Sequence, residues 1–474
     1  MGRLVVVSNR VAVPTRDGKS QAGGLAVALR SVLKNNSGLW FGWSGGIAAS
    51  AAEKQTRTAQ HGDISYVVTD LVHDDYQEYY NGFANRMLWP ILHYRLDLAE
   101  FSRRDLGGYL RVNVHFAEEL EKILQPDDVV WVHDYHLIPL AKTLRERGHR
   151  NKIGFFLHVP FPPPEILTAL PNHDRLIPDL IHYDLVGFQT ENDAANLARY
   201  LSKECLIPRR DADTFQAGER VMRIGVFPIG IETVEFNRLA LRSVVSPFVT
   251  QTVASLAGRD MIIGVDRLDY SKGLRLRMDA FEEFLTTHPD CRGKVTYLQI
   301  TPKSRSDIRE YEDMERQISE AAGRINGAFG EAAWTPIRYV NRAHSRTALA
   351  GLYRSARAAL VTPLRDGMNL VAKEYVAAQD EENPGVLILS RFAGAACELD
   401  SALVVNPYDT EAVGASIARA LSMPLEERRT RHDEMFQVLL ANDVKYWGER
   451  FMTTLTRPHA VPIGIVRSGA FLND

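Results

Sequence analysis

The sequence predicts an α/β protein with two doubly wound parallel-sheet domains that face each other across a cleft. The chain has 474 residues, which is too long for a single hydrophobic core. Short and almost wholly apolar runs recur along it, as buried parallel strands require, and helical patterns separate them. A second series of such runs begins at residue 261, after a stretch of connecting helix. Two Rossmann-like units account for both series.

The composition is that of an ordinary globular protein, with 45% hydrophobic and 24% charged residues and a net charge of −3. This charge balance indicates neither a nucleic-acid surface nor a membrane surface. The cysteines Cys205, Cys291 and Cys397 are far apart, so we expect neither a disulfide framework nor a zinc site. We find no signal-peptide pattern and no apolar run of membrane-spanning length, so we expect a cytoplasmic location.

Polar side chains repeatedly follow the predicted strands of the first series. Asn9 and Arg10 follow the first strand, and Asp134 and His158 follow two later ones. Because the carboxyl ends of parallel strands meet at one edge of a sheet, we expect these side chains to line a ligand site. The predicted strands cover residues 4–8, 40–43, 128–133, 153–157, 185–188 and 221–228.

Two features of the first series are weaker signals. Gly23 and Gly24 precede a helix predicted over 25–33, where backbone N–H groups can cradle a phosphate. Their spacing is not that of a dinucleotide fingerprint. The aromatic-rich stretch 75–95 is expected to be mainly core, with one or two rings free to wall a sugar site.

We place the domain boundary near residue 240. The first domain is predicted over 1–240 and the second over 241–447, and a C-terminal helix within 448–474 is expected to cross back onto the first domain. The strands of the second domain are predicted over residues 261–265, 296–300, 337–340, 358–361, 386–389 and 403–405.

A strand–turn–helix unit in the second domain organises the predicted site. The strand over 358–361 leads through the turn at Asp366 and Gly367 into a helix predicted over 369–378. A helix start at the end of a strand favours phosphate, and Glu374 then lies within reach of a ribose. The alternative is a plain connection in which Asp366 acts as the N-cap.

A basic turn follows the first strand of the second domain. Arg267 and Lys272 lie five residues apart before a helix, and Arg305 follows the next strand. Fixed cations at a helix start suit a diphosphate. The alternative is that Arg267 forms a surface ion pair with Asp266 or Asp269.

No metal site is predicted. His133, His136 and His158 do not have the spacing of ligands on one helix face. The Asp-x-Asp at residues 211–213 follows a polar loop, where a solvated turn is expected. A diphosphate held by two cations and a helix start needs no Mg²⁺, so we expect no cofactor.

Taken together, these motifs closely resemble those of the trehalose-6-phosphate synthases, the UDP-forming retaining enzymes of glycosyltransferase family 20, which have the GT-B architecture. The resemblance runs from about residue 3 to residue 455. The loops 11–20, 46–60 and 205–220 depart from it. It is carried by L-V-V-V-S-N-R, A-G-G-L, E-Y-Y-N-G-F, W-V-H-D-Y-H-L, G-F-F-L-H-V-P-F-P, R-L-D-Y-S-K-G and L-V-T-P-L-R-D-G-M-N-L-V-A-K-E-Y-V-A.

The resemblance implies transfer of glucose from a nucleotide-glucose, most simply UDP-glucose, to the anomeric hydroxyl of glucose 6-phosphate. It implies that His158, Asp134, Asp366, Arg267 and Lys272 serve the reaction. The implied donor residues are Gly24, Arg267, Lys272, Asp366, Met368, Asn369, Leu370 and Glu374, with His158 against the sugar. The implied acceptor residues are Arg10, Tyr80 and Arg305 for the phosphate, and Trp89 and Asp134 for the sugar.

The expected reaction is a metal-independent front-face substitution that begins trehalose synthesis. A separate phosphatase and a homo-oligomer are also expected. Other nucleotide-glucoses, such as GDP-glucose or ADP-glucose, stay open. The alternatives are a glucosylglycerol-phosphate synthase, a pseudo-glycosyltransferase, or a non-catalytic sugar-phosphate sensor. An α-glucan phosphorylase would need a motif around a cofactor-bearing lysine, which we do not find.

Overall fold

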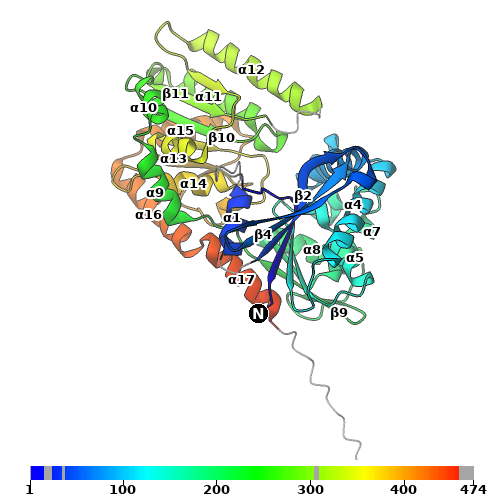
Figure 1. Cartoon of the computed structure of the whole chain (residues 1–474). Helices are drawn as coiled ribbons and strands as arrows, with labels where there is room; N and C mark the ends of the chain where they lie inside the picture. The colour runs from blue at the N-terminus through cyan, green and yellow to red at the C-terminus, as the bar shows by residue number, and fades with distance from the viewer. Residues whose placement is uncertain (1, 15–23, 35–37, 304–308, 458–474) are drawn as a thin grey trace, which may run out of the picture.

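The computed structural model describes residues 2–14, 24–34, 38–303 and 309–457, and for residues 309 and 310 the backbone only. Figure 1 shows two lobes, one blue to cyan and the other green to orange. Each lobe holds one parallel-rich sheet. None of the helices in these ranges has the length and apolarity needed to cross a bilayer.

The first lobe contains a sheet whose described strands run in the order β3-β4-β2-β1-β5-β6-β7-β9-β8. Its interior pairs are parallel, and antiparallel hairpins close both edges. The strands are β1 (Leu4–Arg10), β2 (Leu39–Ala48), β3 (Thr56–His61), β4 (Ile64–Val72), β5 (Val129–His133), β6 (Lys152–Phe156), β7 (Leu185–Phe188), β8 (Thr214–Ala217) and β9 (Arg220–Val226).

The helices of this lobe connect successive strands. They are α1 (Gly24–Lys34), α2 (His73–Asp75), α3 (Trp89–Leu92), α4 (Arg103–Glu121), α5 (Leu140–Glu146), α6 (Pro164–Leu167), α7 (His173–Leu176) and α8 (Glu191–Lys203). A π-helix, η2 (Tyr76–Leu88), holds most of the aromatic-rich stretch. Short 3₁₀ turns are η1 (Ala51–Glu53), η3 (Leu96–Leu98), η4 (Tyr135–Leu137) and η5 (Ile177–His182).

The second lobe contains an all-parallel sheet with the described order β12-β11-β10-β13-β14-β15. Its strands are β10 (Asp260–Val265), β11 (Val295–Ile300), β12 (Ile337–Val340), β13 (Ala358–Val361), β14 (Val386–Ser390) and β15 (Leu403–Val405). Its helices are α9 (Thr233–Ser243), α10 (Pro247–Ala254), α11 (Leu274–Thr287), α12 (Arg309–Phe329), α13 (Arg346–Ser355), α14 (Leu370–Ala378), α15 (Thr410–Ser422) and α16 (Leu425–Ala441), with 3₁₀ turns η6 (Tyr270–Lys272), η7 (Pro289–Cys291) and η8 (Gly394–Cys397).

The chain passes between the lobes twice, and the two passages lie side by side. The Val444 amide donates to the carbonyl of Ile231 at 3.1 Å. Helix α17 (Val444–Thr456) then packs on the first sheet, where Phe451 stacks on Trp131 with ring centroids 4.4 Å apart. In Figure 1 this red helix runs beneath the blue lobe. The crossing helix was expected within 448–474, and the structure describes this stretch only as far as residue 457. The limits of the two domains remain a prediction.

The largest difference from the sequence-based expectation is the pair of edge hairpins. Strand β3 reads T-R-T-A-Q-H and is mostly exposed, so it lacks the apolar run that revealed the buried strands. It pairs antiparallel with β4, in a region where no strand was predicted. Strand β2 is also longer than the predicted 40–43, because its glycine-containing end continues to Ala48.

Candidate active site

A cleft of about 630 Å³ lies between the lobes, at the carboxyl ends of both sets of strands. Because both sheets present this edge to the same space, one ligand can contact residues from each lobe. The predicted residues that line the cleft are Gly24, Tyr80, Trp89, Asp134, His158, Arg267, Lys272, Asp366, Met368, Asn369, Leu370 and Glu374. Arg305 lies outside the described residues, so the structure says nothing of its place.

The start of α14 differs from the alternative considered above, in which Asp366 caps the helix. Asn369, not Asp366, is the N-cap, and its side-chain oxygen accepts from the Ala372 amide at 3.2 Å. It does so with φ = 78°, a conformation that Asn tolerates better than most residues. The amide group of Asn369 donates to Asp366 Oδ2 at 3.0 Å. The cap therefore also fixes the Asp366 carboxylate in the cleft.

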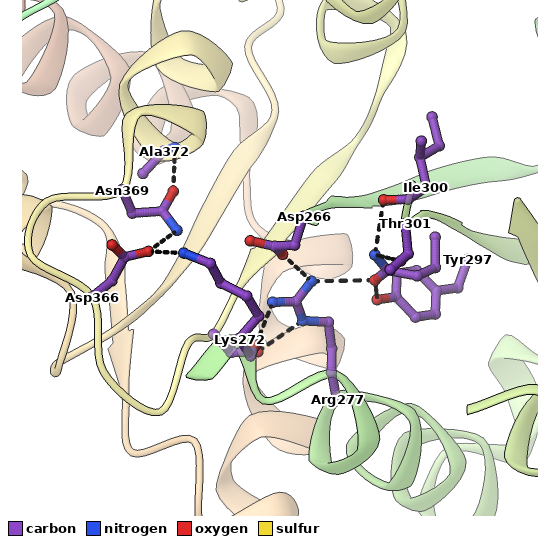
Figure 2. A network of polar contacts seen from close by, with 11 residues as sticks. Asp266, Lys272, Arg277, Tyr297, Ile300, Thr301, Asp366, Asn369 and Ala372 are labelled. Atoms are coloured by element: carbon purple, nitrogen blue, oxygen red, sulfur yellow. Dashed lines mark hydrogen bonds and ion pairs between the residues drawn. The ribbon is translucent and has the colours of Figure 1, made fainter. Parts of the chain in front are cut away.

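Lys272 completes this network from the neighbouring turn, as Figure 2 shows. Its Nζ lies 2.5 Å from Asp366 Oδ2, and the two side chains are only 13% and 15% exposed. The ammonium keeps further N–H donors for a ligand, since Lys has three. Arg267 is exposed on the same turn and also lines the cleft. Both cations thus line the cleft, and Lys272 lies beside the start of α14, where the dipole favours an anion.

Arg277 is a buried residue of this network that the sequence reasoning missed (Figure 2). It is 1% exposed and donates to Asp266 Oδ2 at 2.7 Å, Thr362 Oγ1 at 3.0 Å and the Lys272 carbonyl at 3.2 Å. It therefore ties the Lys272 turn to strands β10 and β13. The alternative pairing of Asp266 with Arg267 is not what the structure has, because Asp266 pairs with Arg277.

Glu374 lies one turn into α14 and lines the cleft. Burial raises the pKa of its carboxyl to about 7, and the charge of Arg346 opposes this shift in pKa only in part. Arg346 lines the cleft beside it and lies 3.5 Å from Glu232 Oε2. His344 lines the same end of the cleft. Neither Arg346 nor His344 was predicted, although both lie in the stretch between β12 and α13 that follows a predicted strand.

The two lobes approach each other closely at the turn before α14. A Cβ added to Gly367 would lie 2.1 Å from the carbonyl oxygen of His158. A Cβ added to Gly24 at the start of α1 would lie 2.6 Å from the Leu370 side chain. Glycine at these two positions therefore allows the elements of one lobe to touch those of the other.

His158 and Asp134 are positioned together on the first lobe. The His158 amide donates to Asp134 Oδ1 at 3.3 Å, and the Asp134 amide donates to the Phe156 carbonyl at 2.8 Å. Asp134 has φ = 77°, which is unusual for a non-glycine residue and is often found at functional sites. His158 also forms a 3.0 Å hydrogen bond with the ring of His133.

The predicted acceptor residues of the first lobe gather around aromatic rings. Tyr80 stacks on His136 with centroids 5.9 Å apart, and it lies 6.0 Å from Trp43. The guanidinium of Arg10 is 5.7 Å from the Trp43 ring centre. Arg10 is exposed beside the cleft and is not one of its lining residues, whereas Asn9 and His136 are.

Trp89 is almost wholly buried, with 5% of its surface exposed. Its ring packs on His93 with centroids 4.1 Å apart, so most of it belongs to the core. Trp89 nevertheless lines the cleft. In the described ranges, no group of three or more His, Cys, Asp or Glu side chains is arranged to hold a metal ion.

Three comparisons relate the chain to known proteins. The family model described as Glycosyltransferase family 20 matches residues 2–457. The trehalose-6-phosphate synthase of Sinorhizobium fredii is 53% identical over 457 residues, which is 96% of this chain and 98% of that protein. The trehalose-6-phosphate synthase of Escherichia coli K12 is 50% identical over 96% of this chain and 95% of its own length.

Solved structures agree with this result. A UDP-forming α,α-trehalose-phosphate synthase from Burkholderia xenovorans, in complex with glucose 6-phosphate, has a TM-score of 0.93 at 47% identity and covers 96% of this chain and 100% of that one. A structure described as trehalose-6-phosphate from E. coli bound with UDP-2-fluoro glucose has a TM-score of 0.90 at 49% identity. The match covers 96% of this chain and 99% of that one. The predicted two-sheet GT-B class is confirmed.

Proposed function

The chain belongs to glycosyltransferase family 20, as a glycosyltransferase of the trehalose-6-phosphate synthase group, and from this premise we propose that it transfers glucose from UDP-glucose to the anomeric hydroxyl of glucose 6-phosphate. The product is α,α-trehalose 6-phosphate. The observation that carries the proposal is the network of Lys272, Asp366 and Asn369 at the start of α14, facing acceptor-side residues of the other lobe. Relatives whose structures contain glucose 6-phosphate or UDP-2-fluoro glucose support the two substrates.

On the donor side, Arg267 and Lys272 bind the diphosphate, and the amide at Gly24 closes over it. Glu374 holds the ribose hydroxyls beside Leu370. Asp366, Met368 and Asn369 hold the hydroxyls of the glucose, against which His158 lies. Support comes from the cleft itself, because all of these residues line it and the two cations share one turn.

On the acceptor side, Arg10, Tyr80 and Arg305 bind the 6-phosphate, and Trp89 and Asp134 position the sugar. The stacked ring of Tyr80 and the cation of Arg10 both lie near Trp43, which supports a shared phosphate site at this end. Action in the cytoplasm as a homo-oligomer, with a separate phosphatase taking the product, belongs to the same proposal.

The reaction proceeds by front-face substitution with retention. The bond from C1 to the diphosphate oxygen breaks, and its electron pair leaves with UDP. The acceptor oxygen attacks C1 from the same side and passes its proton to a phosphate oxygen of the leaving group. Arg267, Lys272 and the helix start stabilise the growing charge of the diphosphate, so the step needs no metal ion.

The test measures nucleotide release from UDP-glucose and GDP-glucose in EDTA, with glucose 6-phosphate, with glycerol 3-phosphate and without any acceptor. Release from UDP-glucose that requires glucose 6-phosphate and persists in EDTA supports the proposal. Faster release with glycerol 3-phosphate would favour the glucosylglycerol-phosphate alternative, and no release from folded protein would favour the sensor. A glucosyl adduct on Asp134 would contradict front-face substitution, because that mechanism forms no covalent intermediate.

A further inference from the structure

Two histidines from neighbouring strand ends share a hydrogen bond beneath the cleft. His133 ends β5, and His158 follows β6. The distance from His133 Nδ1 to His158 Nε2 is 3.0 Å. His158 lines the cleft, whereas His133 is 0% exposed. The buried ring of His133 is therefore linked to the cleft through its hydrogen bond with His158.

Both rings are neutral at physiological pH. Burial lowers the pKa of His158 to about 3. Burial also lowers the pKa of His133, and the neighbouring His158 lowers this pKa further. A neutral imidazole carries one N–H and one acceptor nitrogen. One ring must therefore donate in the bond between them, and the choice fixes where the proton lies on each ring.

The surroundings of His133 decide this choice. Its ring packs against Trp131, Phe156 and Trp447, with centroids 4.6, 6.3 and 6.3 Å away. Its Nε2 is buried and has no hydrogen-bond partner among the described residues. A proton on Nε2 would leave a buried N–H without an acceptor, which is rarer in proteins than a buried acceptor without a donor. The proton of His133 therefore belongs on Nδ1, from which it donates to His158 Nε2.

The proton of His158 then lies on its other nitrogen, Nδ1. No described residue forms a hydrogen bond with this atom in the structure. We propose that His133 is a positioning residue, which holds His158 in the Nδ1–H tautomer so that His158 presents a hydrogen-bond donor to an oxygen of the transferred sugar. The part concerning the sugar rests on the proposed function.

The direct test is nitrogen-15 NMR of the full-length protein labelled at histidine, without substrate. His158 is assigned by comparison with His158→Gln. We expect a protonated Nδ1 and an unprotonated Nε2 in His158, and the same pattern in His133. A proton on Nε2 of His158 would overturn the proposal. This readout needs no turnover, so it stands apart from any failure of the proposed reaction.

Two substitutions of His133 test the consequence for binding. In His133→Asn the side-chain amide keeps a donor near the position of Nδ1, whereas His133→Leu removes it. We expect the Leu variant to raise KM for UDP-glucose about tenfold, the loss of roughly one hydrogen bond, with KM for glucose 6-phosphate unchanged. The Asn variant should stay within about threefold of the wild type. Equal effects of Asn and Leu, or equal rises in both KM values, would show a merely structural role.

Discussion

Replacing Arg277 by Met should destabilise the second lobe strongly and reduce activity with it. The guanidinium is 1% exposed and binds the carboxylate of Asp266, the hydroxyl of Thr362 and the carbonyl of Lys272. Removing one partner of a buried ion pair costs about 3–5 kcal/mol, because the other charge stays buried. Burial already pushes the pKa of Asp266 upward, and Arg277 and then Lys272 oppose that shift in pKa. Without Arg277 the Asp266 carboxyl must bind a proton or remain an uncompensated charge.

The assay is urea unfolding followed by circular dichroism, at pH 5.5 and pH 8. Relative to the wild type, Arg277→Met should lose more unfolding free energy at pH 8 than at pH 5.5. At pH 5.5 the Asp266 carboxyl of the variant can bind a proton, which removes part of the cost of its buried charge. Arg275→Met is the matched control on the same helix, since Arg275 is 46% exposed and pairs with Asp279 at 3.0 Å. An exposed pair of this kind is worth about 0.5 kcal/mol or less.

A double-mutant cycle separates the pair from the rest of the site. In Arg277→Met with Asp266→Asn, no charge is left buried, so the double variant should lose less stability than the sum of the single variants. Activity should stay low, because the turn that carries Lys272 has lost its anchor. An additive cycle, or a loss for Arg277→Met no larger than for Arg275→Met, would refute the role assigned to this residue.

Three further substitutions probe the cleft. Lys272→Ala should lower kcat by on the order of 100-fold or more while leaving glucose 6-phosphate affinity unchanged by calorimetry; a fall under about threefold would contradict its role at the diphosphate. Glu374→Gln tests the raised pKa of about 7. Between the ordinary carboxyl pKa and pH 7 the folded wild type binds a proton that the unfolded chain does not, so the Tm of the wild type should rise relative to that of Glu374→Gln as pH falls through this window. Parallel plots of Tm against pH for the two proteins would contradict the raised pKa. Gly367→Ala places a methyl group 2.1 Å from the carbonyl oxygen of His158 and should raise KM for UDP-glucose. The control Gly107→Ala meets nothing within 4 Å and should leave KM unchanged. Equal KM values for the two variants would show that the close approach of the lobes at Gly367 does not affect donor binding.

The sequence allowed the buried strands and the turns at their carboxyl ends to be predicted well. Strands such as β5 and β13 are continuous apolar runs, and the polar residues after them mark the edge of a parallel sheet. The exposed strand β3 gave no such signal, because an edge strand with polar side chains resembles a loop. Predictions based on apolar runs therefore found most interior strands of each sheet. They missed the exposed strand β3 and also its largely buried neighbour β4, whose run I-S-Y-V-V-T-D-L-V is interrupted by polar residues.

The local pattern indicated site residues in the turns after strands and at the helices that these turns begin, as for Lys272, Asp366 and Glu374. Arg277 lies within α11 among other charged residues, and nothing in the local pattern separates a buried arginine from an exposed one. The bond between His133 and His158 depends on the neighbouring positions of β5 and β6, which are 25 residues apart in sequence. Long-range pairing of this kind cannot be seen in one sequence, so the supporting residues were missed while several strand-end residues were found.

The position of α17 has a consequence for the synthesis of the protein. Phe451 stacks on Trp131, and Trp447 lies 4.8 Å from the same ring, so residues near the end of the described chain cover the sheet that forms from its first 226 residues. A ribosome delivers these residues only after the whole second lobe has been made. Until then the nascent first lobe presents an uncovered apolar face. Chaperones should therefore bind ribosome-stalled chains of this protein until the chain is long enough for residue 456 to have left the ribosome.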